Sequence, residues 1–214
     1  MSEVRRKLRK KTQEVLRRLS RIKRKFVTPS FPKNKDGKVL VHIGCGEIKS
    51  PEFINIDARP FAHIHIITNE LASLPTFEDA SVDLIYMCHV LEHVKTPDLL
   101  NVLAEMKRVL KNGGILRLSV PDFDRIIEIY NDCNKDINSV TASLMGGQEH
   151  EYNIHYSVFN RRRLTELLQD AGFRKVLPWD PNNCEYHNFE DYASRIIQVN
   201  DKECFISLNL EAVK

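Results

Sequence analysis

The sequence predicts an α/β fold built on a doubly wound, mostly parallel sheet. From Lys38 onward, short apolar runs alternate with stretches of helical periodicity along the 214-residue chain. The first apolar run ends in a Gly-Cys-Gly turn at Gly44–Gly46, where a strand can pass into a ligand-binding loop. Strands that alternate with helices form a parallel sheet that is covered on both faces. We therefore expect one α/β domain, residues 31–214, preceded by a separate N-terminal element.

Seven segments have the apolar and β-branched composition of strands. They are 39–43, 53–57, 64–67, 82–87, 115–120, 175–179 and 204–210. A helix is predicted between the fourth and fifth segments, with Thr96 as its cap and Pro97 in its first turn. A second helix is predicted after Asn160 and ends at Gly172.

Residues 1–30 are predicted to form a basic amphipathic helix and a linker. Residues 1–26 hold twelve Lys or Arg and two acids, a net charge of +10, whereas the whole chain has +3. Apolar residues recur there at helical spacing, at Val4, Leu8, Val15, Leu19, Ile22 and Phe26. Such a helix can bind an anionic membrane surface or a partner helix, or it can be a solvated connection to an upstream part of a longer protein. Nucleic acid is the partner that we least expect.

The composition predicts a cytoplasmic protein that the basic helix can hold at the periphery of a membrane. No run of about 18 apolar residues exists, so no membrane-spanning helix is expected. The basic N-terminus lacks the apolar stretch of a secretory signal. The five cysteines form no C-x-x-C pair and are odd in number, which indicates reduced thiols.

The Gly-Cys-Gly turn and a later acid predict a nucleoside site. Asp57 ends the next predicted strand, eleven residues after Gly46, where its carboxylate can accept hydrogen bonds from both ribose hydroxyls. A nicotinamide cofactor would need a third glycine for its pyrophosphate, but Glu47 follows Gly46 and would repel phosphate. A cofactor with ribose and adenine but no phosphate fits better, and S-adenosylmethionine is such a molecule.

Several motifs, taken in order, resemble the class I S-adenosylmethionine-dependent methyltransferases, in particular a branch found in glycan and lipopolysaccharide gene clusters. The matching stretches include Val41–Gly46, Phe53–Asp57, Leu74–Pro75, Ser81–Tyr86, His89–His93, Leu110–Gly114 and Val120–Asp122. The resemblance covers nearly everything from Lys38 onward. It implies a Rossmann-like, seven-stranded sheet, S-adenosylmethionine as cofactor, and transfer of a methyl group to a hydroxyl of a sugar or surface glycan.

The resemblance also implies which residues contact the cofactor. The family's motifs place the methionine part on the backbone of the turn, the ribose on the acid, the adenine beside the Leu-Pro motif, and the methionyl group at the end of the fourth strand. In this sequence these residues are Gly44, Cys45, Gly46, Asp57, Glu70, Leu71, Cys88 and His89. The chain departs from the family at His42, where Asp or Asn is usual, and at Glu70, where Asp is usual.

Transfer to a hydroxyl also requires a general base. We expect it near the ends of the fourth and fifth strands or in the insert after the fifth. His155 is the first candidate, with Asp122 orienting it or the acceptor, and His150 is the second. The polar and aromatic residues around them, between Gly146 and Tyr156, suit a sugar, because aromatic rings stack on sugars and polar groups bind hydroxyls.

The segment His89–His93 matches H-x-x-E-H, an inverted zinc-protease signature, but it closes a strand here and not a protease helix. We predict no metal ligands. The sequence leaves open whether His89, Glu92 and His93 hold a divalent ion, because residues i, i+3 and i+4 of a helix share one face. The alternative is that Glu92 and His93 cap and pack the start of a helix.

Two other functions remain open. The acceptor could be a small aromatic, a quinone precursor or a protein side chain, and a quinone would require a mostly apolar pocket. The chain could also be a non-catalytic scaffold of methyltransferase fold. The presence of Gly44, Gly46 and Asp57 argues against that second alternative.

Overall fold

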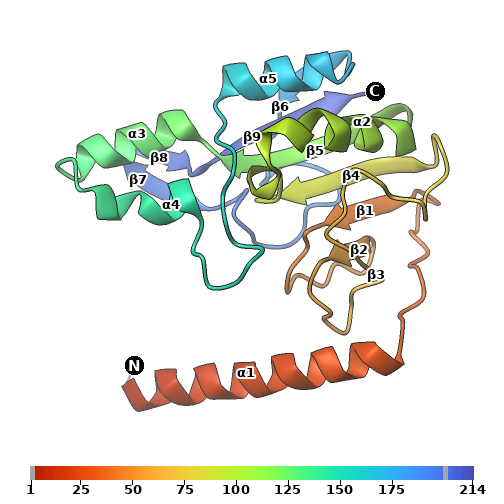
Figure 1. Cartoon of the computed structure of the whole chain (residues 1–214), viewed down its shortest axis with the longest axis horizontal. Coiled ribbons are helices and arrows are strands. Elements are labelled where there is room, and N and C mark those ends of the chain that lie inside the picture. The colour runs from red at the N-terminus through yellow and green to blue at the C-terminus, as the bar shows by residue number, and fades with distance from the viewer. Residues whose placement is uncertain (1–2, 200–201) are drawn as a thin grey trace.

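The computed structural model confirms the α/β fold and describes residues 3–199 and 202–214 (Figure 1). Seven strands form the central sheet in the order β3-β2-β1-β4-β5-β9-β6. The strands are β1 (Leu40–Ile43), β2 (Ile54–Asp57), β3 (Ile66–Ile67), β4 (Val82–Cys88), β5 (Leu110–Pro121), β6 (Lys175–Pro178) and β9 (Ser207–Val213). The pairs among β3, β2, β1, β4 and β5 are parallel, whereas β9 is antiparallel to both β5 and β6. The carboxyl ends of the five parallel strands therefore meet at one edge of the sheet.

Helices follow the sheet in the expected places and in two unexpected ones. They are α1 (Glu3–Phe26), α2 (Leu99–Val109), α3 (Phe123–Asp132), α4 (Thr141–Met145) and α5 (Arg161–Asp170), with short 3-10 turns at Leu91–His93, Thr96–Asp98 and Ile137–Ser139. The prediction of α2 and α5 is confirmed. The helices α3 and α4 were not predicted, and both lie in the insert between β5 and α5.

Helices α2 and α5 cover one face of the sheet (Figure 1). Their apolar sides meet the strands in the main core, where Leu103 of α2 and Leu164 of α5 are fully buried. Asn160 caps α5 as predicted, since its Oδ1 accepts a hydrogen bond of 3.0 Å from the Arg163 N–H. The predicted cap of α2 is wrong: Thr96 lies in a 3-10 turn before the helix, and its hydroxyl is 3.1 Å from that of Ser157.

The opposite face of the sheet is covered by the irregular segment 179–195 and, among the described residues, not by helices. Trp179, Phe189 and Tyr86 pack there in an aromatic cluster, and the Trp179 indole donates 2.9 Å to the Leu118 carbonyl. The connection between β1 and β2, residues 44–53, is shorter than the dozen or more residues that a helical crossover needs.

The last predicted strand is two strands in the structure. The run 204–210 contains the end of β8 (Lys202–Phe205) and the start of β9, and the chain changes partner between them at Ile206. β8 pairs with β7 (Ile196–Val199) in a separate antiparallel hairpin beside α3 (Figure 1). No glycine or proline marks this change, so composition could not reveal it.

Helix α1 lies apart from the layers, along the β2–β3 side of the domain (Figure 1). It contacts the domain through polar side chains: Ser20 Oγ accepts 2.7 Å from the Ala62 N–H, and the Arg24 guanidinium donates to the Ile64 and His65 carbonyls at 2.6 and 3.0 Å. Within the described residues no helix combines the length and apolarity needed to cross a membrane.

Candidate active site

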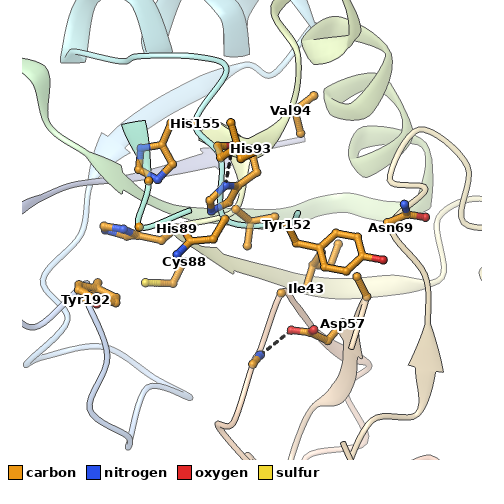
Figure 2. Close-up of a pocket in the computed structure, with 18 of the residues that line it drawn as sticks. Ile43, Asp57, Asn69, Cys88, His89, His93, Val94, Tyr152, His155 and Tyr192 are labelled. Atoms are coloured by element: carbon orange, nitrogen blue, oxygen red, sulfur yellow. Dashed lines mark hydrogen bonds between the residues drawn. The ribbon is translucent and has the colours of Figure 1, made fainter. Parts of the chain in front are cut away.

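A cavity of about 1270 Å³ opens at the carboxyl ends of β1, β2 and β4. This is the edge at which open parallel sheets bind ligands. All eight residues predicted to contact the cofactor line it, namely Gly44, Cys45, Gly46, Asp57, Glu70, Leu71, Cys88 and His89. The opposite wall comes from the insert after β5 and from the segment before β7 (Figure 2).

The turn after β1 depends on its glycines. Gly44 and Gly46 have φ of 66° and 57°, in the left-handed region that residues with a Cβ rarely adopt. A Cβ on Gly44 would also collide with Cγ2 of Val90. The Gly44 N–H donates 2.8 Å to the Ile56 carbonyl and the Gly46 N–H donates 2.8 Å to Asp57 Oδ2, so the turn is folded tightly onto β2.

Asp57 ends β2 and is only 6% exposed. Its Oδ1 accepts from Arg59 twice, from the backbone N–H at 2.8 Å and from Nε at 3.2 Å, and Figure 2 shows the carboxylate at the cavity wall. A carboxylate has about four lone-pair directions, so acceptor capacity remains for ribose hydroxyls. Arg59 was missed in the sequence analysis, because an Arg two residues after an acid is a common pattern.

His42, where the family has Asp or Asn, does not replace their polar contact. Its ring is 1% exposed and stacks on Phe189, with the ring centroids 5.5 Å apart. Burial lowers the pKa of His42 from 6.5 to about 3, so the ring is neutral. Its Nδ1 has no hydrogen-bond partner among the described residues. His42 thus belongs to the aromatic cluster of the covered face.

His155, the first candidate for general base, lies in the cavity wall with a defined tautomer. Its Nδ1 is 3.1 Å from the Ser143 carbonyl, which can only accept, so Nδ1 carries the proton and the lone pair is on Nε2. Burial lowers the pKa of this imidazole, which keeps it neutral. The Nε2 atom is 3.9 Å from Oε1 of Glu92.

The other two catalytic candidates are placed differently. His150 lines the cavity, with Nε2 3.5 Å from Nη1 of Arg59. Asp122 does not line it; its Oδ1 accepts 3.2 Å from the Asp124 N–H and caps α3. In the described part of the chain no hydrogen bond joins Asp122 to His155. Asp122 follows β5 directly, and its side chain caps the N-terminus of α3 instead. The orienting role of Asp122 has no contact to support it.

His89 has a strained backbone at the end of β4. Its φ of 53° is in the left-handed region, which for a non-glycine residue indicates a constraint of the kind found at functional sites. Its N–H donates 2.8 Å to the Ser119 carbonyl, and its ring stacks on Tyr192 with centroids 4.6 Å apart. Tyr192, Asp191 and Arg195 line this part of the cavity and were missed, since nothing in the pattern of segment 179–195 indicated a site.

The chain matches the family model described as "Methyltransferase domain" over residues 8–177. Similar curated proteins include a demethylmenaquinone methyltransferase of Staphylococcus haemolyticus, 33% identical over 121 residues, and one of Staphylococcus aureus, 31% identical over 121 residues. Each of these two matches covers 53% of this chain and 49% of the relative, so the chain spans about half the length of the relatives.

Solved structures of low sequence similarity share the fold. One from Thermotoga maritima, described as a SAM-dependent methyltransferase and possible histamine N-methyltransferase, is 18% identical with a TM-score of 0.50 and covers 98% of this chain and 97% of its own. A SAM-dependent methyltransferase from Archaeoglobus fulgidus is 15% identical with a TM-score of 0.50 and covers 92% and 94%. With the glycine turn, the buried acid and the cavity between them, the family match shows that the chain belongs to the class I S-adenosylmethionine-dependent methyltransferases.

Proposed function

We propose that this enzyme methylates a hydroxyl of a polar, sugar-like acceptor. The observation that carries the proposal is the composition of the cavity wall opposite the glycine turn. Polar and aromatic side chains predominate there, namely Ser143, Glu149, His150, Tyr152, Asn153, His155, Tyr156, Asp191, Tyr192 and Arg195. Such a wall can stack on a sugar ring and bind several hydroxyls.

A quinone precursor is the competing acceptor, because the curated relatives are demethylmenaquinone methyltransferases. An apolar bicyclic ring would need a wall rich in aliphatic side chains, and Ile126, Ile154 and Ile206 are a minority here. The relatives also match only about half of their length. The polar wall therefore favours the sugar-like acceptor.

Each part of the cavity has a separate task in this proposal. S-adenosylmethionine supplies a methyl group on a sulfonium, which needs no further activation. The glycine turn and Asp57 hold the cofactor at the ends of β1 and β2. The wall of the insert positions the acceptor hydroxyl, and proximity and alignment lower the barrier by several kcal/mol. The lone pair on Nε2 of His155 is available to take the hydroxyl proton.

The test is an incubation of the protein with methyl-labelled S-adenosylmethionine and a panel of acceptors. The panel contains mono- and oligosaccharides, demethylmenaquinone and a catechol, and each product is analysed for an O-methyl or C-methyl group. Labelled saccharide with an O-methyl group is the expected result. Label in demethylmenaquinone, with none in any saccharide, would contradict the proposal and favour the quinone.

We also propose that α1 binds an anionic membrane surface. From Val15 onward its apolar stripe faces away from the domain: Val15, Leu19 and Ile22 are exposed, and Phe26 is 83% exposed. The opposite side of the helix contacts the domain through Ser20 and Arg24, as described above. The net charge of +10 over residues 1–26 complements anionic headgroups, at about 1 kcal/mol per basic residue near the surface.

Vesicle sedimentation with the full chain tests this second proposal. Binding to vesicles with anionic lipid should exceed binding to zwitterionic vesicles and fall with salt. Ile22→Asp should reduce binding by roughly tenfold or more, since it places a charge in the apolar stripe. The matched control is Leu100→Asp, which changes an exposed leucine on α2. Equal binding by both variants, or a lipid-independent dimer formed through α1, would overturn the proposal.

A further inference from the structure

Glu92 is the most unusual side chain near the cavity. It lies in the 3-10 turn after β4, is 1% exposed, and neither carboxylate oxygen has a hydrogen-bond partner among the described residues. Its Oε1 lies 3.4 Å from Nδ1 of His89 and 3.9 Å from Nε2 of His155. A buried carboxyl group without a hydrogen-bond partner is costly, so this position calls for an explanation.

Two histidines that cluster with Glu92, His93 and His155, have a defined tautomer. Nδ1 of His93 is 3.0 Å from the Ile154 carbonyl, just as Nδ1 of His155 is 3.1 Å from the Ser143 carbonyl. A carbonyl can only accept, so both rings carry their proton on Nδ1 and have an unprotonated Nε2. Burial lowers the pKa of both rings and keeps them neutral.

His89 adds a third lone pair. The Ser207 hydroxyl donates 2.8 Å to the Tyr192 carbonyl, so its oxygen accepts from His89 Nε2 at 2.8 Å. The proton of His89 is therefore on Nε2, and Nδ1 is the unprotonated atom that lies 3.4 Å from Glu92. Three imidazole lone pairs and the Glu92 carboxyl group thus converge, and among the described residues neither Glu92 oxygen has a hydrogen-bond partner. Figure 2 shows the three rings together on one side of the pocket.

We propose that Glu92, His93 and His155 bind a divalent transition-metal ion. One ligand atom from each lies within 4.8 Å of the others. Two ligands at about 2.1 Å from an ion are at most about 4.2 Å apart, so small side-chain rotations complete the site. Two imidazoles and one carboxylate suit ions from Mn²⁺ to Zn²⁺. The Ile154 and Ser143 carbonyls hold the two rings in orientation, as outer-shell acceptors do in metal sites.

The role of this ion in the reaction rests on the proposed function. His93 and His155 line the cavity, so the remaining coordination positions face the acceptor. Acceptor hydroxyl oxygens bind there, and the ion lowers the pKa of a bound hydroxyl, whose proton passes to solvent water. With the ion bound, Nε2 of His155 is a metal ligand, so the ion takes over from His155 the activation of the acceptor hydroxyl.

Cobalt titration of the chelator-treated full chain tests the site without any acceptor. Visible d–d absorption should saturate at one equivalent of Co²⁺, and Zn²⁺ should displace it. Glu92→Gln, His93→Asn and His155→Asn should each weaken binding more than the roughly 10–100-fold that outer-shell changes cost. His150→Asn is the matched control, because that histidine lines the same cavity outside the cluster and should leave the affinity unchanged. Thermal unfolding checks that every variant is folded.

Absence of stoichiometric Co²⁺ and Zn²⁺ binding by the folded wild-type protein would overturn the proposal. Binding that the three cluster variants retain would overturn it equally, since the ion would then lie elsewhere. The methylation assay with labelled S-adenosylmethionine, run on the same preparation, separates the metal site from the proposed function. Metal binding without methylation of any hydroxyl would support the metal site and contradict the proposed function. Saccharide methylation without metal binding would support the proposed function and contradict the metal site.

Discussion

The two halves of the cavity are built from different kinds of atoms. The cofactor half consists largely of backbone at strand ends, with the Gly44 and Gly46 N–H groups folded against β2 and Asp57. The acceptor half consists of side chains from the insert after β5 and the segment before β7. A binding site made of backbone groups at strand ends is determined by the order of the strands. A binding site made of side chains can change its specificity with each substitution. The comparison predicts that variants in the two halves alter different measurable quantities.

The largest expected effect is on turnover. His155→Ala should reduce the turnover number by about 10²–10⁴-fold, because it removes a general base or, with the ion bound, a metal ligand. The dissociation constant of S-adenosylmethionine should stay within about twofold, since His155 belongs to the acceptor half. Steady-state kinetics and calorimetry measure the two quantities. Full turnover by the variant would move the base to His150, which also lines the cavity.

The second effect is on the glycine turn. Gly44→Ala should weaken binding of S-adenosylmethionine and lower the free energy of unfolding by about 2–5 kcal/mol, from φ strain and the collision with Val90. Gly113→Ala is the matched control, because Gly113 has φ of 78° but nothing within 4 Å of an added Cβ. It should cost only the strain, about 1–2 kcal/mol, and leave cofactor binding unchanged. Equal effects of the two variants on binding would refute the assigned role of the turn.

The third effect concerns the buried acid. Asp57→Ala should raise the dissociation constant of S-adenosylmethionine roughly tenfold or more, because charge-assisted hydrogen bonds contribute about 1.5–3 kcal/mol. At saturating cofactor the turnover number should recover. Glu151→Ala, an acid of the acceptor half, should leave the cofactor constant unchanged. If the constant is the same for Asp57→Ala and the wild type, Asp57 does not bind the ribose.

The last effect is a pH dependence of stability that originates at His42, in the aromatic cluster of the covered face. The unfolded chain protonates His42 below about pH 6.5, whereas in the folded protein its pKa is about 3. This contribution to stability is therefore complete above pH 6.5 and is lost as pH falls toward 3, at about 1.4 kcal/mol per pH unit. Urea unfolding between pH 6 and 4 should show a shallower loss for His42→Phe than for wild type. Parallel curves would mean that His42 is not buried as described.

The sequence predicted the cofactor half much better than the acceptor half. Strand periodicity, the two glycines and Asp57 are local signals, and the parallel order of β1, β2 and β4 brings them together. Glu92 was considered only as part of the short motif His89–His93. Its contact with His155 lies between residues that are 63 positions apart in the sequence, and hydrophobic periodicity gives no information about contacts over that separation. The polar wall was expected from residues 146–156, but Tyr192 and Arg195 were not.

The contrast between local and long-range signals also explains which secondary-structure predictions were wrong. The helices α2 and α5 have long apolar stripes and were predicted, whereas α4 spans only Thr141–Met145 and has no such stripe. The run 204–210 reads as one strand because both of its halves are apolar, and only tertiary pairing divides it at Ile206. Local composition determines which segments form elements, and packing determines where the chain changes partner.

A crystal structure of the protein soaked with S-adenosylhomocysteine tests the central claim most directly. The account predicts the ligand in the cavity, with its homocysteine part against the Gly44–Gly46 backbone and both ribose hydroxyls within hydrogen-bond distance of Asp57. A ligand bound elsewhere, or a ribose turned away from Asp57 in a fully occupied cavity, would contradict it.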